Sequence, residues 1–479
     1  MITIITTKVL DNGKAICDNI QVIPLFMGKY SIWRTFMKKM CFLGMFIVIL
    51  AALVMAGGQR AGGAVTLRFM DISPSPERQA FYTSTFASFK AETGITVNYE
   101  STPWDDAANK LTALGVSNSL PDVMTCWEGW LGQFTNAGWV LPLEKYIVGT
   151  ESSYTETITK KLWPKQKQLY GAIYTVPDGL MVKGIYVRKD WAQEKGLNLN
   201  PDRGWTYDEY FDAIRVLTDA SQRRYGVSYR GARGGFDPIS VYLTGFAEGR
   251  FYDNRGNILL KTPEVLDGFI KWTNLYLNGY SPRDSINWGF TELVDNFTGG
   301  LTGTLLNDSE VAATCQASMR DDQWMVMPMP RSKDGKIYNT VNAPYAYSIS
   351  THSKNPDAAW RLIEFLNRPD NSIKYCKMGG LIPIKTDIAG DPTFGVTGTY
   401  RAFVLQLNDP NMVIPTTYGP FNYTDMHQGM MHEEIQKYLL GQQDARTALE
   451  IILNELEVRM KKYMVDNPSY RIEQPLANF

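Results

Sequence analysis

The sequence predicts an α/β protein with two lobes. Strand patterns at residues 65–70, at residues 95–100 and after Pro121 are each followed by a helical pattern, and such alternation is typical of a parallel sheet covered by helices. The rhythm starts again with a strand pattern at residues 181–187. A chain of 479 residues is long enough for more than one core, so we interpret the restart as a second lobe.

Residues 109–147 contain the clearest βα unit of the chain. They comprise a helix end, a turn, a short apolar strand, the aromatic loop Cys126-Trp127-Glu128-Gly129-Trp130 and a second helix. In open α/β sheets, ligands bind beyond the carboxyl ends of the strands. The aromatic loop occupies that position, so we expect a ligand to be held there.

Further elements are expected along the whole chain. Thr206 and Glu209 have the spacing of a capping box at a helix start. The Gly-rich stretch 297–308 reads as a turn running into a strand whose carboxyl end carries polar residues, as the aromatic loop does. The other predicted helices cover residues 76–92, 263–277, 356–366, 426–440 and 444–464, and the other predicted strands cover 324–329 and 346–350.

Composition argues against some classes of partner. The chain has 48 Lys and Arg against 49 Asp and Glu, which leaves a formal charge of -1, so no long-range field favours nucleic acid. Aromatic residues make up 12% of the chain, and they suit a cleft that grips flat apolar faces.

A targeting signal is predicted near the N-terminus. Residues 37–56 combine two lysines, an apolar run and small residues at a cleavage position, the pattern of a secretory signal peptide. Cleavage and retention as a membrane anchor both stay open, and export is expected either way. Residues 1–36 lack this character, so we interpret them as an upstream extension before a true start at Met37.

Other chemistry has little support in the sequence. Cys126, Cys315 and Cys376 permit at most one disulfide, and their pairing is left open. His427 and His432 lie five residues apart, where a metal pair on a helix needs three or four, so we interpret them as surface residues. The common hydrolase, phosphate-loop and zinc motifs do not occur. We therefore predict binding without turnover, no cofactor and no metal.

Six stretches resemble extracellular solute-binding proteins of ABC importers, in the sugar-binding group that includes maltose-binding protein. The stretches occur in one order over nearly all of the chain after residue 65. They are the PDV strand with its AGWVLPL exit (121–143), GIYVRKDW (184–191), GWTYDEY (204–210), FTGGLTGTLLND (297–308), MPMPRSKDGK (327–336) and SISTHSKNPDAAWRLIEFL (348–366).

The resemblance implies a two-lobe periplasmic-binding-protein fold, type II-like, whose lobes close by hinge motion around a ligand. The implied crossings lie at 177–182, 342–346 and 379–383. Lobe 1 is then expected to cover residues 65–178 plus 345–380, and lobe 2 residues 179–344 plus 381–479. The implied ligand is a mono- or oligosaccharide, the implied partners are the permease subunits of the importer, and a monomer is expected.

A sugar site needs aromatic planes for C–H faces and carboxylates or amides for hydroxyls. Trp127 and Glu128 supply one of each, although Trp127 could simply pack the strand end.

Asn307 and Asp308 stand at the family's ligand position on lobe 2, where the alternative is an ordinary Asn/Asp turn. The family often has Trp just beyond that position; here Glu310 stands there instead. The remaining candidates are Asp71 at the end of the first strand, Trp288 as a substitute stacking residue, and Trp104, Asp178 and Tyr345, each with an obvious structural alternative.

Two other functions stay open. One is a receptor of the same fold whose ligand is not a sugar or which signals to a chemosensory partner. The other is an exported glycan-active enzyme, because many carboxylates are present and a glycosidase pair cannot be identified or dismissed by counting.

Overall fold

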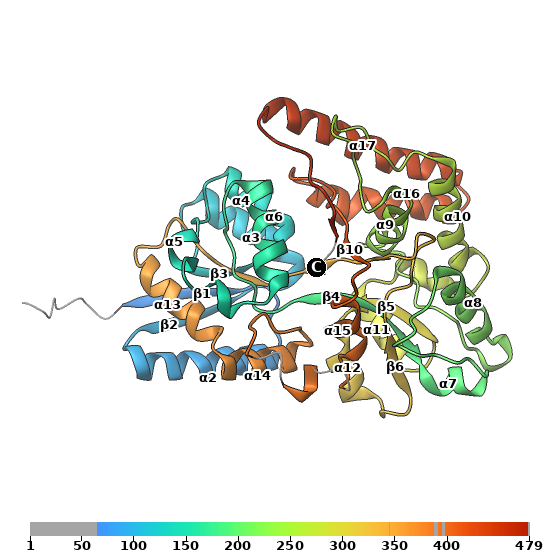
Figure 1. The fold of residues 1–479 in the computed structure, drawn as a ribbon, viewed down its shortest axis with the longest axis horizontal. Helices are drawn as coiled ribbons and strands as arrows, with labels where there is room; N and C mark the ends of the chain where they lie inside the picture. Colours follow the sequence, from blue (N-terminus) through green and yellow to red (C-terminus); the bar gives the residue numbers. More distant parts are fainter. Residues whose placement is uncertain (1–64, 344, 388–390, 395–397, 478–479) are drawn as a thin grey trace, which may run out of the picture. The chain divides into compact units, whose positions relative to one another are not determined.

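The computed structural model describes residues 65–343, 345–387, 391–394 and 398–477 (Figure 1). The chain from Ala64 onward forms one compact unit. The predicted signal peptide at 37–56 and the extension at 1–36 lie outside the described residues.

The first sheet has the strand order β2 (Thr96–Ser101), β1 (Thr66–Asp71), β3 (Val123–Cys126) and β9 (Ala346–Ile349). The pairs β1–β2 and β1–β3 are parallel, as the βα alternation predicts, whereas β9 runs antiparallel to β3. Helices α2 (Pro76–Thr93) and α14 (Pro369–Gly379) lie on one side of this sheet, and α3 (Trp104–Val116) and α4 (Glu128–Asn136) lie on the other (Figure 1).

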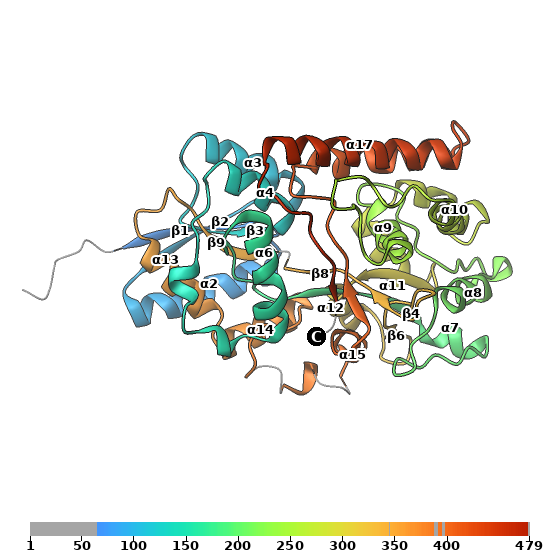
Figure 2. The same ribbon diagram turned by 45° about the horizontal axis from the view of Figure 1, so that its top comes forward.

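The second sheet is antiparallel. Strand β4 (Met181–Arg188) lies between β5 (Thr304–Asp308) and β6 (Trp324–Met327), and β8 (Val341–Asn342) pairs with its start. The sequence pattern after residue 180 did not predict that β5 runs antiparallel to β4. Several helices lie between these strands, and a connection of that kind can lead to a parallel or an antiparallel neighbour. Helices α9 (Phe236–Thr244), α10 (Pro263–Leu277) and α17 (Ala445–Asp466) lie on one side, and α12 (Val311–Ser318) and α15 (Arg401–Leu407) on the other (Figure 2).

A third, small sheet contains β11 (Leu476–Ala477), β10 (Met412–Ile414) and β7 (Ile337–Tyr338). The remaining helices are α5 (Glu144–Ile147), η1 (Glu151–Ser153), η2 (Thr157–Leu162), α6 (Trp163–Tyr170), α7 (Lys189–Glu194), α8 (Tyr207–Leu217), η3 (Ala220–Gln222), η4 (Gly245–Ala247), η5 (Arg283–Asn287), α11 (Phe290–Thr298), α13 (Pro356–Leu366), η6 (Pro392–Phe394), η7 (Met426–Met430) and α16 (Met431–Leu439).

Three chain segments run between the first and second sheets and lie next to one another. Leu180 and Ile382 exchange both backbone hydrogen bonds at 2.8 Å, and Met181 pairs with Asn342 in the ladder of β4 and β8. These residues lie in the three crossings that the resemblance implied. The chain therefore has two lobes linked by several neighbouring hinge segments.

Most of the predicted elements are confirmed, and α10 and α13 match their predicted bounds residue for residue. The capping box of Thr206 and Glu209 is present. The predicted helix at 426–440 is split, because the wide turn η7 precedes α16. Helix α9 was not predicted from the sequence. Gly235, just before its first residue, supplies no capping side chain, and seven of its nine residues are buried, so the helix lacks the polar face that an amphipathic pattern needs.

Candidate functional site

A cavity of about 120 Å³ lies between Trp127, at the end of β3, and the start of α9. Its wall also includes Lys165 of α6, Lys183 of β4 and residues of the loop that follows β10. A second cavity of about 70 Å³ shares Trp127 and Lys165 with the first, and a third of about 30 Å³ shares Lys183 and Asp237. The three cavities are therefore neighbours that share walls, and strand ends from both lobes contribute to these walls.

Asp237 is the central acid of this site. Its carboxylate accepts a hydrogen bond from the Tyr418 hydroxyl at 2.8 Å and lies 2.9 Å from Nε2 of His427. Burial opposes its charge, but His427, Lys183 and Arg230 outweigh burial and hold the pKa of Asp237 well below its usual range. Asp237 is therefore a charged acceptor at neutral pH.

The interpretation of His427 as a surface residue is wrong. Its side chain is only 13% exposed, lines the cavity and lies 5.8 Å from the Trp127 ring, centroid to centroid. The sequence spacing tested only a metal pair, and the partner of His427 is 190 residues away on α9. No local signal could have paired them.

Asn307 and Asp308 end strand β5 beside Lys183 of β4. The register pairs Lys183 with Asp308, and the ammonium lies 2.9 Å from one carboxylate oxygen. The other oxygen of Asp308 and the amide nitrogen of Asn307 are buried and make no hydrogen bond within the described part of the chain. A buried polar atom without a partner is costly, so these two atoms are available to a bound molecule.

Glu128 is the first residue of α4 and lines the second cavity with Lys165. Burial raises the pKa of Glu128 to about 7; Lys165 opposes this shift, and the Glu473 carboxylate adds to it. Because its pKa lies near neutral pH, Glu128 can serve as a hydrogen-bond donor in its protonated form and as an acceptor in its ionised form.

Trp127 is held by other aromatic rings. Its centroid lies 5.7 Å from that of Trp104 and 5.9 Å from that of Trp130. A Cβ atom at position 129 would lie 2.2 Å from the Trp127 ring, so Gly129 gives the indole room to fold over the first turn of α4. Trp104 and Trp130 therefore fix the position of the Trp127 ring; Trp130 is itself buried in the core, and Trp139 packs against that core.

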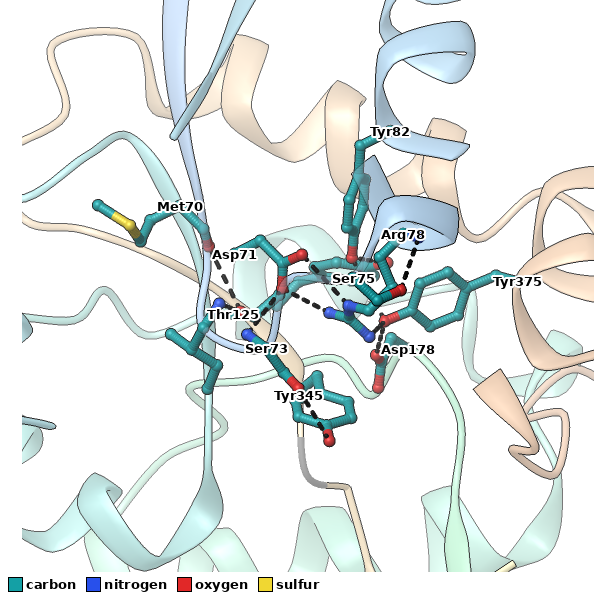
Figure 3. Close-up of polar contacts among 12 residues, drawn as sticks. Met70, Asp71, Ser73, Ser75, Arg78, Tyr82, Thr125, Asp178, Tyr345 and Tyr375 are labelled. Atoms are coloured by element: carbon teal, nitrogen blue, oxygen red, sulfur yellow. Dashed lines mark hydrogen bonds and ion pairs between the residues drawn. The ribbon is translucent and has the colours of Figure 1, made fainter. Parts of the chain in front are cut away.

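A separate polar cluster lies at the end of β1 (Figure 3). Asp71 is fully buried and binds the Arg78 guanidinium at 2.6 and 3.2 Å. The same guanidinium contacts the Tyr375 hydroxyl, which donates to Asp178 at 2.6 Å. Burial raises the pKa of Asp178 to about 6, although Arg78 and Tyr375 oppose the shift. This cluster joins β1 and α2 to a hinge segment and to α14.

Tyr345 connects this cluster to the second lobe. Its ring lies under Arg78, 4.5 Å from the guanidinium carbon, and its hydroxyl lies 3.4 Å from Glu310, just after β5. Burial raises the pKa of Glu310 to about 7, with a contribution from Asp308. The residue that replaces the family's Trp therefore contacts the hinge.

The structure brings four predicted site residues to the cavities: Trp127, Glu128 and Asn307 line them, and Asp308 binds Lys183 at the wall. It does not bring Trp288 there. Trp288 is 4% exposed, its indole nitrogen donates to Asp284 at 3.3 Å, and it packs in the core with Leu293 and Phe297.

Asp71, Asp178 and Tyr345 belong to the neighbouring cluster, and their ligand roles stay predictions. Sequence reasoning missed Lys165, Lys183, Asp237, Tyr418, Tyr423 and His427.

Cys126, Cys315 and Cys376 are buried and unpaired. Among the described residues, no three His, Cys, Asp or Glu side chains are grouped as metal ligands. Likewise, none of the helices described is both long and apolar enough to span a bilayer.

Two α/β lobes, several hinge segments and a polar, aromatic cavity between strand ends define a solute-binding protein. Residues 73–373 match the family model of the bacterial extracellular solute-binding protein. The chain belongs to this family.

Relatives of the chain include proteins with sugar ligands in their names. A binding protein of Brucella abortus is 22% identical over 78% of this chain and 88% of its own length. The galactooligosaccharide-binding protein of Bacillus subtilis is 23% identical over 76% of this chain and 83% of its own. A solute-binding protein from Thermotoga lettingae, solved with α-D-tagatose, has a TM-score of 0.70 at 20% identity, covering 83% of this chain and all of that one. The structural likeness confirms the two-lobe fold.

Proposed function

We propose that this protein is an exported receptor that captures a carbohydrate between its lobes and delivers it to an ABC importer. The lobes are proposed to divide as residues 65–178 plus 345–380 and residues 179–344 plus 381–479. The observation that carries the proposal is that the Trp127 ring from one lobe and Asn307 from the other line neighbouring cavities that share Lys183 and Asp237, with unpartnered polar atoms on Asn307 and Asp308.

The chemistry of the cavity suits a polyhydroxyl ligand. An indole offers a flat face to the C–H side of a sugar ring. Asp237 and Asp308 can accept hydrogen bonds from hydroxyls, while the Asn307 amide and Lys183 can donate. Lys183 pairs with Asp308, and Lys183 and Arg230 also act on Asp237, so cations offset both carboxylates and the ligand favoured is a neutral sugar or polyol.

Binding without turnover is part of the proposal. Asp308 is paired with Lys183, and Asp237 is bound by Tyr418 and His427, so neither carboxylate is free for bond cleavage. Glu128, with a pKa of about 7, and His427 are cavity groups that a glycan-active enzyme could use as a general acid. Incubation with oligosaccharides separates the two functions, because an enzyme releases shorter products and a receptor returns the sugar unchanged.

A thermal-shift panel of neutral sugars and polyols tests the binding proposal. A tight ligand stabilises the folded state by about 4 kcal/mol at a thousandfold excess over Kd. We expect one or more neutral members to raise Tm clearly and their uronic acid counterparts to do so less. Peptides and amino acids are included for comparison, and hits from these compounds alone would overturn the carbohydrate assignment.

Export and assembly need their own measurements. N-terminal sequencing and intact mass of the protein from the cell envelope test cleavage after residues 37–56 and a start at Met37. Light scattering on a sizing column tests the expected monomer. Co-purification with membrane permease subunits, dependent on the sugar, tests delivery to the importer.

A further inference from the structure

The C-terminal segment 468–477 follows α17 and contacts both lobes before its last strand joins the small sheet. In Figure 1 the chain leaves α17 and runs back alongside β10, where Leu476 and Ala477 pair with Ile414 and Val413. On its way it meets α6, a helix associated with α4, and the Gln168 side chain donates to the Ile472 carbonyl at 3.4 Å. The segment therefore contacts helices of one lobe and the small sheet of the other.

Glu473 is the most constrained acid of this segment. It is 5% exposed, and one carboxylate oxygen lies 3.0 Å from the Lys165 ammonium. The other oxygen accepts from the backbone N–H and the hydroxyl of Thr417, at 2.8 and 2.7 Å. Lys165 and Thr417 both line the first and second cavities. Glu473 thus holds two cavity residues from two separate elements.

The Lys165–Glu473 pair is buried on both sides, with side-chain exposures of 11% and 6%. Burial works against the Lys165 ammonium, but the Glu473 and Glu128 carboxylates outweigh it and raise the pKa of Lys165. Breaking a buried pair by removing one partner costs far more than breaking an exposed one, because it leaves a charge uncompensated. Separation of the two lobes would have to break this pair or carry the C-terminal segment with α6.

The loop 415–423 makes the second contact across the lobes. Its Thr416 is fixed to its own lobe by bonds to Gly249 and Phe251, at 2.8 and 3.0 Å. On the other side its Pro420 carbonyl approaches α4 so closely that a Cβ at Gly132 would lie 2.4 Å from the oxygen. Gly132 therefore gives this loop room to seat against α4.

We propose that the loop 415–423 and the segment 468–477 form a clasp that holds the lobes closed, fastened by Glu473 to Lys165, with Glu473 acting as a positioning residue for the cavity wall. Three contacts carry this inference: the buried ion pair and the close approach of Pro420 to α4 cross the lobes, and the hydrogen bonds of Glu473 to Thr417 join the two parts of the clasp. The clasp proposal rests on the proposed function only in that the lobes close around a sugar; the contacts that hold the lobes together do not depend on which ligand binds.

The test measures the distance between the lobes directly. Spin labels are attached to Val116→Cys at the end of α3 and Leu440→Cys after α16; these side chains are 72% and 59% exposed, whereas the three native cysteines are buried. Pulsed dipolar spectroscopy without sugar then compares the labelled protein with its Glu473→Gln and Lys165→Met variants. We expect both substitutions to increase the population at longer distances severalfold.

The matched control is Glu457→Gln. Glu457 is paired with Lys261 and Lys461 on and around α17, within one lobe, so its loss should leave the distances unchanged. If Glu473→Gln gives the same distances as the parent protein, the clasp is refuted. If the Glu473→Gln variant does not fold, the Lys165→Met variant tests the proposal instead, because it removes the same ion pair by changing the residue on the other lobe. Because no sugar is added, a failed sugar panel and a failed clasp are separate results.

Discussion

The cluster around Arg78 and the cavity around Trp127 both lie at strand ends, and both combine carboxylates with cations. In the first, both Asp71 oxygens bind the Arg78 guanidinium, and the Tyr99 hydroxyl adds a bond at 3.0 Å. In the second, an Asp308 oxygen and the Asn307 side-chain nitrogen lack partners within the described chain, and space remains between Trp127 and Asp237. The position of a residue at a strand end therefore does not separate a structural residue from a candidate ligand residue; its bonds and the space beside it have to be compared as well.

The largest effect is expected from Asp71→Asn. The substitution leaves the buried Arg78 without its counter-ion, so the free energy of unfolding should fall by about 3–5 kcal/mol, measured by urea denaturation. Glu100→Gln is the control, because its pair with Arg68 in the same sheet is about one-third exposed and should lose about 1 kcal/mol or less. A stable Asp71→Asn variant that loses only sugar affinity would instead support a ligand role for Asp71.

Trp127→Ala should act on affinity more than on stability. We expect a panel sugar to bind about 10- to 100-fold more weakly, the range of a stacking residue whose loss costs about 1.4–2.8 kcal/mol, measured by calorimetry. Trp139→Ala is the control, since that ring packs against Gly115 and Phe134 away from the cavity. Unchanged affinity in the Trp127 variant would remove its ring from the site.

A smaller effect is expected from pH at the Arg78 cluster. The pKa of Asp178 rises from an ordinary 3.8 to about 6, so between these values the folded protein keeps a proton that the unfolded chain has lost. Its contribution to stability is present below pH 4 and is lost as pH rises to 6. The free energy of unfolding is measured at pH 4 and at pH 7 in both proteins. We expect the decrease between these pH values to be about 1–2 kcal/mol smaller in Asp178→Asn than in the parent. The exposed Asp267→Asn variant should retain the parent's slope; an equal slope in Asp178→Asn would contradict the assignment.

The smallest effect on binding is expected from Trp288→Phe. Trp288 lies in the core, so its replacement should cost some stability and leave the affinity for a panel sugar within about twofold, which corresponds to about 0.4 kcal/mol. Calorimetry on the folded variant measures this. A large loss of affinity would return Trp288 to the site and show that a core contact controls the cavity.

Much of the fold could be predicted because local patterns carry it. Pro263 and Pro356 at helix starts and the reciprocal bonds of Thr206 and Glu209 depend on neighbours within a few residues. The site was only half predictable. Trp127 and Glu128 follow β3, and Asn307 and Asp308 end β5, so their positions at strand ends made them predictable, whereas Asp237 and His427 meet only in the folded protein.

The sequence by itself determined the order of strands and helices, the hinge segments and the polar and aromatic residues at the ends of β3 and β5. Tertiary structure decided which polar atoms stay without a partner: both Asp71 oxygens are bonded, by Arg78 and Tyr99, whereas one Asp308 oxygen has no partner within the described chain. It also decided that β4, β5 and β6 run antiparallel and that Glu473 returns to Lys165 across more than 300 residues. Such choices depend on contacts between segments far apart in the chain, which no local pattern encodes.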